Sequence, residues 1–178
     1  NCFRKPRFEV LEPRLPLSGD PIVLDPNETD WAFAPQLTIS QFADDFNDRI
    51  SDNILIDIEV NKVNGQPLIS SIWQQNLEAR NSANHINLTS SQFNEKSVQY
   101  GNNGFRLIDQ ESYLVRGQQY YAATWLENLE EHEWAAHYNL TSADFSNRLN
   151  QYHAEYILTD MEAYPVGNST RYSGSWIA

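Results

Sequence analysis

The sequence predicts an α+β fold made of three tandem copies of one helix-and-hairpin unit. A Leu-Thr pair recurs about every 51 residues, beginning at Leu37, Leu88 and Leu140, and each pair carries the signals of a helix start. Two extended runs joined by a Gly-containing turn follow each helix, and the second run ends on Trp. We expect successive hairpins to join into one curved antiparallel sheet with the helices packed on one face.

Each predicted helix begins after an N-cap threonine. In the first copy, Gln41 stands three residues after Thr38, which is the spacing of a capping box, and Leu37 and Phe42 occupy the positions of a hydrophobic staple. The same signals recur in the other copies, at Thr89, Gln92 and Phe93 and at Thr141, Asp144 and Phe145. Apolar residues at helical spacing then give each helix one apolar stripe, which Ser97 weakens in the second copy.

The hairpin of each copy has a fixed pattern. Its first strand contains Leu-x-Asp-x-Glu, and a Trp stands sixteen residues after the Asp, at Trp73, Trp125 and Trp176. The turns are Asn64-Gly65, Arg116-Gly117 and Gly167-Asn168. Alternation along the second strand places a small residue between two large ones on one face, in Ile69/Ser71/Trp73, Tyr121/Ala123/Trp125 and Tyr172/Gly174/Trp176. We expect this face to pack under the helix.

These signals divide the chain into two parts. The copies span about residues 37–73, 88–125 and 140–176, with connectors between them. Trp31-Ala32 precedes the first Leu-Thr pair by six residues, as Trp134-Ala135 precedes the third, so the three-repeat array is expected to cover residues 31–178. Residues 1–30 form a basic, Pro-rich segment and linker. Because the chain begins with Asn1 and its start lacks the apolar core of a signal peptide, we expect a fragment of a longer chain.

Composition excludes several classes of function. The formal net charge is −12, and an acidic surface repels the phosphate backbone, so we expect no nucleic-acid partner. The single cysteine, Cys2, permits no intrachain disulfide and no metal-thiolate site. No stretch approaches the roughly 18 consecutive apolar residues of a membrane helix, so we expect no membrane span.

The repeat resembles a known family. The pattern L-T-x-x-x-F, L-x-D, a Gly turn, Y-x-x-x-W and W-A-x-x-Y/H-x-L-T is clearest from Tyr120 to Thr141. It resembles the bacterial tandem repeat found beside beta-lactamase-like serine hydrolases and in the non-catalytic N-terminal half of polyglycine hydrolases. The resemblance covers roughly residues 31–178, although the first copy has Ile69 in place of the Tyr. It implies an accessory role, with hydrolysis belonging to a separate domain.

The opening segment resembles a second pattern. Phe8 to Pro21 is similar to the LEPR-XLL motif near the start of large envelope-associated bacterial proteins, with Pro16 where that motif usually has Leu. This resemblance implies a secreted or cell-envelope surface location. The alternative is a proline-stiffened linker with no targeting role.

Motifs for catalysis are missing from the sequence. Each of Lys5, Lys62 and Lys96 lacks a Ser three residues before it, as the beta-lactamase signature requires, and there is no Gly-x-Ser-x-Gly elbow. His132 and His137 imitate a zinc-protease motif but are five residues apart instead of four, so they would not share a helix face. We therefore expect no catalytic residues, no cofactor and no enzyme activity in this chain.

The repeated Asp-x-Glu is the most specific polar feature. Residues two apart on a strand share a face, so aligned copies would stack these carboxylates. They are candidate calcium ligands, and the residues are Asp57, Glu59, Asp109, Glu111, Asp160 and Glu162. The alternative is that they pair with arginines of neighbouring copies, such as Arg49, Arg106, Arg148 or Arg171. Three equivalent pairs do not suit the single cleft of a glycosidase.

Exposed aromatic residues are the other binding candidates. Tyr113, Tyr120, Tyr138 and Tyr164 are expected on the face opposite the core, where they would stack on sugars or anchor a protein. The leading hypothesis is therefore a non-catalytic extracellular binding or scaffold module, with a surface protein, a glycan or an adjacent domain of the same polypeptide as partner. The alternative is the accessory N-terminal region of a secreted beta-lactamase-type serine hydrolase.

Overall fold

The computed structural model describes residues 30–178, which form three successive units of the same plan. Unit 1 contains β1 (Trp31–Leu37), α1 (Ile39–Arg49), β2 (Asn53–Val63) and β3 (Gln66–Gln75). Unit 2 contains β4 (Ser82–Leu88), α2 (Ser90–Asn102), β5 (Phe105–Val115) and β6 (Gln118–Glu127). Unit 3 contains β7 (Trp134–Leu140), α3 (Ser142–Tyr152), β8 (Ile157–Val166) and β9 (Ser169–Ile177). The LEPR-XLL-like motif predicted from Phe8 to Pro21 lies outside the described residues.

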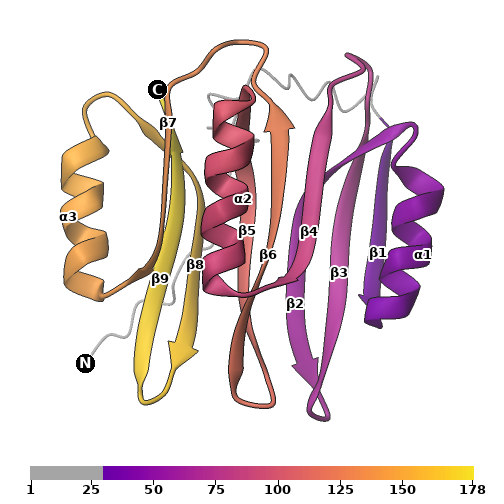
Figure 1. The fold of residues 1–178 in the computed structure, drawn as a ribbon, viewed down its shortest axis with the longest axis horizontal. Helices are drawn as coiled ribbons and strands as arrows, with labels where there is room; N and C mark the ends of the chain where they lie inside the picture. Colours follow the sequence, from indigo (N-terminus) through magenta and orange to yellow (C-terminus); the bar gives the residue numbers. More distant parts are fainter. Residues whose placement is uncertain (1–29) are drawn as a thin grey trace, which may run out of the picture.

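The units lie side by side in chain order along the longest axis of the molecule, with the three hairpin turns at the same end (Figure 1). Each unit has its own three-stranded antiparallel sheet, with strand orders β1-β3-β2, β4-β6-β5 and β7-β9-β8. The second hairpin strand is thus central, and the connector strand pairs with its free edge. The first hairpin strand, β2, β5 or β8, is the edge that faces the neighbouring units.

The expectation of one continuous curved sheet is corrected by this strand order. The connectors were not predicted to be strands, yet β1, β4 and β7 occupy the hairpin edge that a neighbouring hairpin would have needed. The other edge carries a β-bulge in every unit, between Leu55 and Asp57 in β2 and at the matching places in β5 and β8. A bulge disrupts the hydrogen-bond ladder at an edge. The units therefore pack through side chains instead of sharing a ladder.

The predicted helix starts are confirmed. Thr38, Thr89 and Thr141 are the N-caps of α1, α2 and α3, and all three make a complete capping box. In α3 the short Asp144 side chain takes the place of glutamine and accepts from the Thr141 main-chain N–H at 3.3 Å. Local sequence thus fixes where each helix begins, because these bonds satisfy amides that would otherwise lack partners.

The predicted hairpin faces are also confirmed. Trp73, Trp125 and Trp176 are at most 2% exposed, and they pack beneath the helices of their own units. The small residue beside each Trp makes room for the rings: a Cβ added at Gly174 would lie 3.0 Å from Trp176 and 3.1 Å from Phe145. The turns also match the prediction, since Asn64-Gly65 has two positive φ angles, 50° and 82°, as tight hairpins require.

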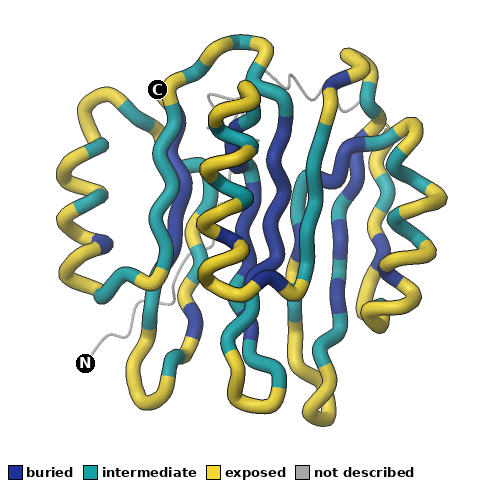
Figure 2. Tube along the Cα trace, viewed as in Figure 1, coloured by how far each residue is buried: buried dark blue, intermediate teal, exposed yellow. Residues whose placement is uncertain are grey.

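Each core is built mainly within one unit and is completed by residues of the next. The first core combines Phe42, Leu55 and Trp73 of unit 1 with Tyr113 and Ala122 of unit 2. The second joins the corresponding residues of unit 2 to the β7 strand of unit 3. Burial is accordingly concentrated along the strands, while the helices present mostly exposed residues to solvent (Figure 2). Each unit completes the core of the one before it, as in solenoid proteins.

None of the helices within residues 30–178 is long and apolar enough to cross a membrane.

Candidate functional site

The acidic residues of the repeat lie at the interfaces between units. In each hairpin the bulge precedes the Asp, and cross-strand pairing then places Asp and Glu on one face of the sheet: Asp109 is opposite Thr124 and Glu111 is opposite Ala122. Ala122 belongs to the core shared with unit 1, so this face of unit 2 is the one directed at unit 1. The Asp-x-Glu sequence is therefore an interface motif.

The Asp of one unit bonds to the main chain of the unit before it. The Asp109 carboxylate of unit 2 accepts a hydrogen bond from the main-chain N–H of Ile58 in unit 1 at 3.1 Å, and the contact is buried. The Asp160 carboxylate of unit 3 accepts from the main-chain N–H of Gln110 in unit 2 in the same way. A side chain thus satisfies the edge amide that a continuous sheet would have paired with another strand. The equivalent residue of unit 1, Asp57, is half-buried.

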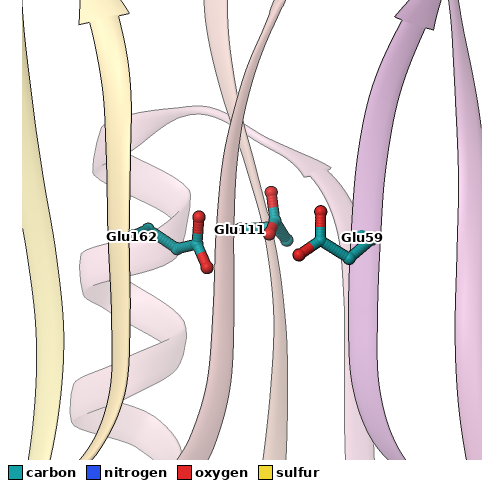
Figure 3. Close-up of side chains that lie close together, drawn as sticks. All are labelled: Glu59, Glu111 and Glu162. Carbon is teal, nitrogen blue, oxygen red and sulfur yellow. The ribbon is translucent and has the colours of Figure 1, made fainter. Parts of the chain in front are cut away.

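The three glutamates of the repeat converge. One carboxylate oxygen from each of Glu59, Glu111 and Glu162 lies within 4.8 Å of the others, and Figure 3 shows the carboxylates pointing toward one another from β2, β5 and β8. Glu111, in the middle unit, is 5% exposed, whereas Glu59 is exposed. Of the predicted calcium candidates, these three are therefore the ones that could place an oxygen each on a common ion.

Burial and mutual repulsion favour the protonated forms of these acids. Burial, followed by repulsion from Glu162 and Glu59, raises the pKa of Glu111 from 4.5 to about 10. Burial and repulsion from Asp160 raise the pKa of Glu162 to about 7. The pKa of Asp109 is raised well above its ordinary value, mainly by burial, while the bond from Ile58 opposes the shift. At neutral pH the cluster therefore retains protons, and Glu111 and Glu162 are joined by a hydrogen bond.

The alternative of arginine pairing receives no support at two of the named positions. Arg49 bonds to Asp45 within its own helix at 2.7 Å, and Arg148 bonds to Gln151 at 2.7 Å. A different arginine does link successive units: the Arg80 side chain, 3% exposed, donates to Glu130 in the connector of the next unit and also pairs with Glu78. Sequence reasoning missed this ion pair, because its partners stand fifty residues apart in connectors that vary between copies.

Two of the four tyrosines predicted to be exposed are buried in the interfaces. Tyr113 and Tyr164 are 8% and 3% exposed, and Tyr120 and Tyr138 are half-buried. The Tyr113 hydroxyl accepts from the main-chain N–H of Asn87 at 2.8 Å and donates to its side-chain oxygen at 2.9 Å. The Tyr164 hydroxyl accepts from the Asn139 main chain at 2.8 Å. The expectation of exposure was wrong for this pair, because the face opposite the unit's own helix is covered by the preceding unit.

The histidines have structural partners. His137 is 2.9 Å from the Tyr152 hydroxyl and packs against Trp176, while His132 lies 3.0 Å from the main-chain oxygen of Ala178. The two residues of the zinc-like sequence therefore engage different neighbours. His85 and Tyr100 form the equivalent pair in unit 2, at 2.7 Å. Burial, then repulsion from Lys96, lowers the pKa of His85.

Shallow hollows mark the interface between units 1 and 2. One, of about 210 Å³, opens near the hairpin turns and is bordered by Val60, Pro67 and Tyr113. Another, of about 190 Å³, lies between α1 and β4 and is bordered by Phe42, Phe46 and His85. Neither contains the convergent acids.

Comparison with known proteins agrees with the units seen in the structure. The model of one family, described as polyglycine hydrolase-like structural repeat, matches residues 82–128 and 131–177, together more than half of the chain. These ranges coincide with units 2 and 3, connector strand included. No curated protein and no solved structure matches the chain.

Proposed function

Because the chain belongs to the polyglycine hydrolase-like structural-repeat family, we propose that it is a non-catalytic extracellular repeat module whose main role is that of a scaffold. The observation that most supports this role is the buried bond from Asp109 to the main chain of the preceding unit. The repeated Asp of units 2 and 3 serves to join each of these units to the one before it. Side chains engaged in this way are not available to act on a substrate.

A scaffold must hold its two ends at a fixed separation, and the interfaces supply the necessary stiffness. Each joins apolar packing to a buried carboxylate bond, and the Arg80–Glu130 pair adds a tie between connectors. Local hinge motion would expose these buried groups at a free-energy cost. The array is therefore suited to position a neighbouring domain of the same polypeptide, or a surface protein or glycan, at a defined distance.

Spin-label distance measurements test the scaffold role. Labels at Asp48→Cys on α1 and Gln151→Cys on α3, in a Cys2→Ser background, report the separation of units 1 and 3. We expect one narrow distance distribution. A broad or multimodal distribution would show that the units move independently and would contradict the proposal. Labels at Asp48→Cys and Lys62→Cys, both in unit 1, provide the control for the width contributed by the labels themselves.

The proposal that the chain is non-catalytic has its own test. Incubation with a glycine-linker peptide and with a chromogenic beta-lactam is expected to give no product above the buffer control. Turnover of either substrate, abolished by heat denaturation, would refute it. Cosedimentation of the chain with insoluble cell-wall polymers tests the binding role separately, with bovine albumin as a control for trapping.

A second candidate is that the chain serves as an accessory region of a secreted beta-lactamase-type serine hydrolase. The family description, polyglycine hydrolase-like, supports this candidate. The encoding gene beyond Ala178 distinguishes the two. A downstream domain with Ser-x-x-Lys supports the accessory role, whereas more repeats or adhesin-like modules support a free-standing scaffold. Cell-surface or secreted location is part of both proposals, and digestion by protease added to intact source cells tests it.

A further inference from the structure

The hollow between α1 and β4 lies at the junction of units 1 and 2 and has mainly apolar walls. Phe42 and Phe46 of α1 and Ile86 of β4 line it, and its volume is about 190 Å³. An apolar cavity of about 150 Å³ already accepts benzene. The α1–β4 hollow is therefore large enough for one aromatic ring.

The corresponding place between units 2 and 3 holds a tyrosine ring of the chain itself. Ile86 and Tyr138 are equivalent, since each is the fifth residue of its seven-residue connector strand. The Tyr138 ring packs edge-on against Phe93, with centroids 5.0 Å apart, and lies 5.5 Å from the Tyr121 ring. Phe93 is the counterpart of Phe42, since both follow an N-cap threonine by four residues. Ile86 has no ring, so a hollow lies beside Phe42 where the tyrosine contact would be.

The side-chain amide of Asn84 adds a polar feature to this lining. Neither its oxygen nor its nitrogen has a hydrogen-bond partner among residues 30–178, and both atoms are buried. Ala136 stands in its place in β7. A tyrosine combines an apolar ring with a hydroxyl that both donates and accepts. A rotation of the Asn84 side chain would bring its amide to such a hydroxyl, so the lining matches a tyrosine better than a phenylalanine.

We propose that the α1–β4 hollow receives a tyrosine side chain of a protein partner, in the way that Tyr138 packs on Phe93 between units 2 and 3. This inference rests on the binding role in the proposed function and narrows its partner to a protein whose surface presents a tyrosine. Tyrosine is among the side chains enriched at the energetically important contacts of protein interfaces. A sugar ring fits less well, because it carries hydroxyl groups around its ring and most walls of the hollow offer them no partner.

NMR titration of the isotope-labelled full chain with N-acetyl-L-tyrosinamide tests the proposal. We expect shifts of the main-chain amides of Ala43, Asn47 and Ile86, which line the hollow, with a Kd on the order of 1 mM for a ligand of this size. N-acetyl-L-phenylalaninamide lacks the hydroxyl and should bind about three- to tenfold more weakly. Asn84→Ala should remove this difference, because it removes the partner of the hydroxyl. Methyl glucoside should leave the amides that line the hollow unshifted.

Two variants close the hollow in different ways. Ile86→Tyr supplies the chain's own ring, as Tyr138 does, and should abolish binding of the tyrosine probe without lowering Tm. Ala43→Trp places a large ring at the edge of the hollow from an exposed position on α1, so it tests the same point if Ile86→Tyr does not fold. The matched control is Asn94→Trp, at the equivalent exposed position of α2, which should bind the probe like wild type.

Three outcomes would overturn the proposal. The first is the absence of shifts with the tyrosine probe, and the second is binding that Ile86→Tyr and Ala43→Trp leave intact. The third is equal affinity for the two aromatic probes, or shifts caused by the glucoside alone, which would indicate a different occupant. The scaffold role is tested independently. No binding together with a narrow spin-label distribution overturns only this inference, whereas a broad distribution contradicts the scaffold role whatever the probe does.

Discussion

Replacing Tyr113 with phenylalanine tests whether the interface tyrosines stabilise the array through their hydroxyl groups. In the wild type this hydroxyl bonds twice to Asn87, at 2.8 and 2.9 Å, and the ring is 8% exposed. Asn87 has a φ of 58°, a conformation in which non-glycine residues are uncommon. The bonds therefore fix Asn87, two residues before the N-cap of α2, in this conformation. The Tyr113→Phe variant keeps the ring packing and removes only the bonds.

The expected loss follows from the two bonds. A net hydrogen bond contributes about 0.5 to 1.5 kcal/mol, and an amide left unsatisfied costs about 1 to 3 kcal/mol. We expect the free energy of unfolding to fall by about 2 kcal/mol. For a chain of this size, each 1 kcal/mol lowers Tm by about 2 to 4 °C, so Tm should fall by about 4 to 8 °C. Urea unfolding, monitored by tryptophan fluorescence, measures the free energy of unfolding. Differential scanning calorimetry measures Tm.

The matched control is Tyr120→Phe. The Tyr120 ring stacks beside Tyr113 with centroids 6.3 Å apart, and its hydroxyl makes neither of the two bonds to Asn87. This variant is expected to change Tm by less than about 2 °C, because it keeps the ring and removes neither bond to Asn87. Equal losses in the two variants, or no loss in Tyr113→Phe, would refute the assignment of stability to the hydroxyl bonds.

Three further predictions concern the helix, the core and the acids. Thr89→Ala removes the N-cap of α2 and should cost about 1 kcal/mol in urea unfolding, and an unchanged midpoint would contradict the capping role. Gly174→Ala places a Cβ 3.0 Å from Trp176 and should cost about 1 to 3 kcal/mol by calorimetry; a neutral effect would show that the rings shift easily. Glu111 titrates near pH 4.5 when unfolded and near pH 10 when folded, so between these values the folded state binds more protons and the free energy of unfolding falls as pH rises. Glu111→Gln should therefore raise Tm more at pH 8 than at pH 5. The control variant Glu155→Gln, which changes an exposed residue, should not show this difference. Equal effects of Glu111→Gln at both pH values would contradict the burial of a titrating acid.

Local signals in the sequence were sufficient to predict most of each unit. The capping boxes at Thr38, Thr89 and Thr141 depend on residues three positions apart, and the hairpins depend on turn residues such as Asn64-Gly65. The buried tryptophans follow from two-residue alternation along the strand. Such features are set by short-range geometry, and the structure agrees with all of them.

The connector strands and the packing of units could not be predicted in the same way. Residues 82–88 contain few apolar residues, and Asn87 adopts a left-handed conformation inside the strand, so no alternating pattern marked β4. Because β4 was not predicted, the edge of β6 was expected to be free and to pair with the neighbouring hairpin. The burial of Tyr113 was missed for the same reason, since alternation places it on the acidic face but does not reveal that another unit covers this face.

The candidate site was predicted in part. Alternation correctly placed Asp and Glu on one face of each strand, and the threefold repetition indicated that equivalent acids would stack. It could not show that Asp109 bonds to a main-chain amide of another unit while Glu59, Glu111 and Glu162 converge. That difference depends on the bulge preceding each Asp and on the distance between units, which are properties of the assembled array.

Hydrogen exchange at the Ile58 amide tests the central claim, that the repeated Asp joins each unit to the one before it, most directly. We predict that this amide is strongly protected in the wild type, that Asp109→Ala removes the protection while α1 amides keep theirs, and that Asp109→Asn, which retains an acceptor oxygen, preserves it. An Ile58 amide that exchanges at the same rate in wild type and Asp109→Ala would contradict the claim.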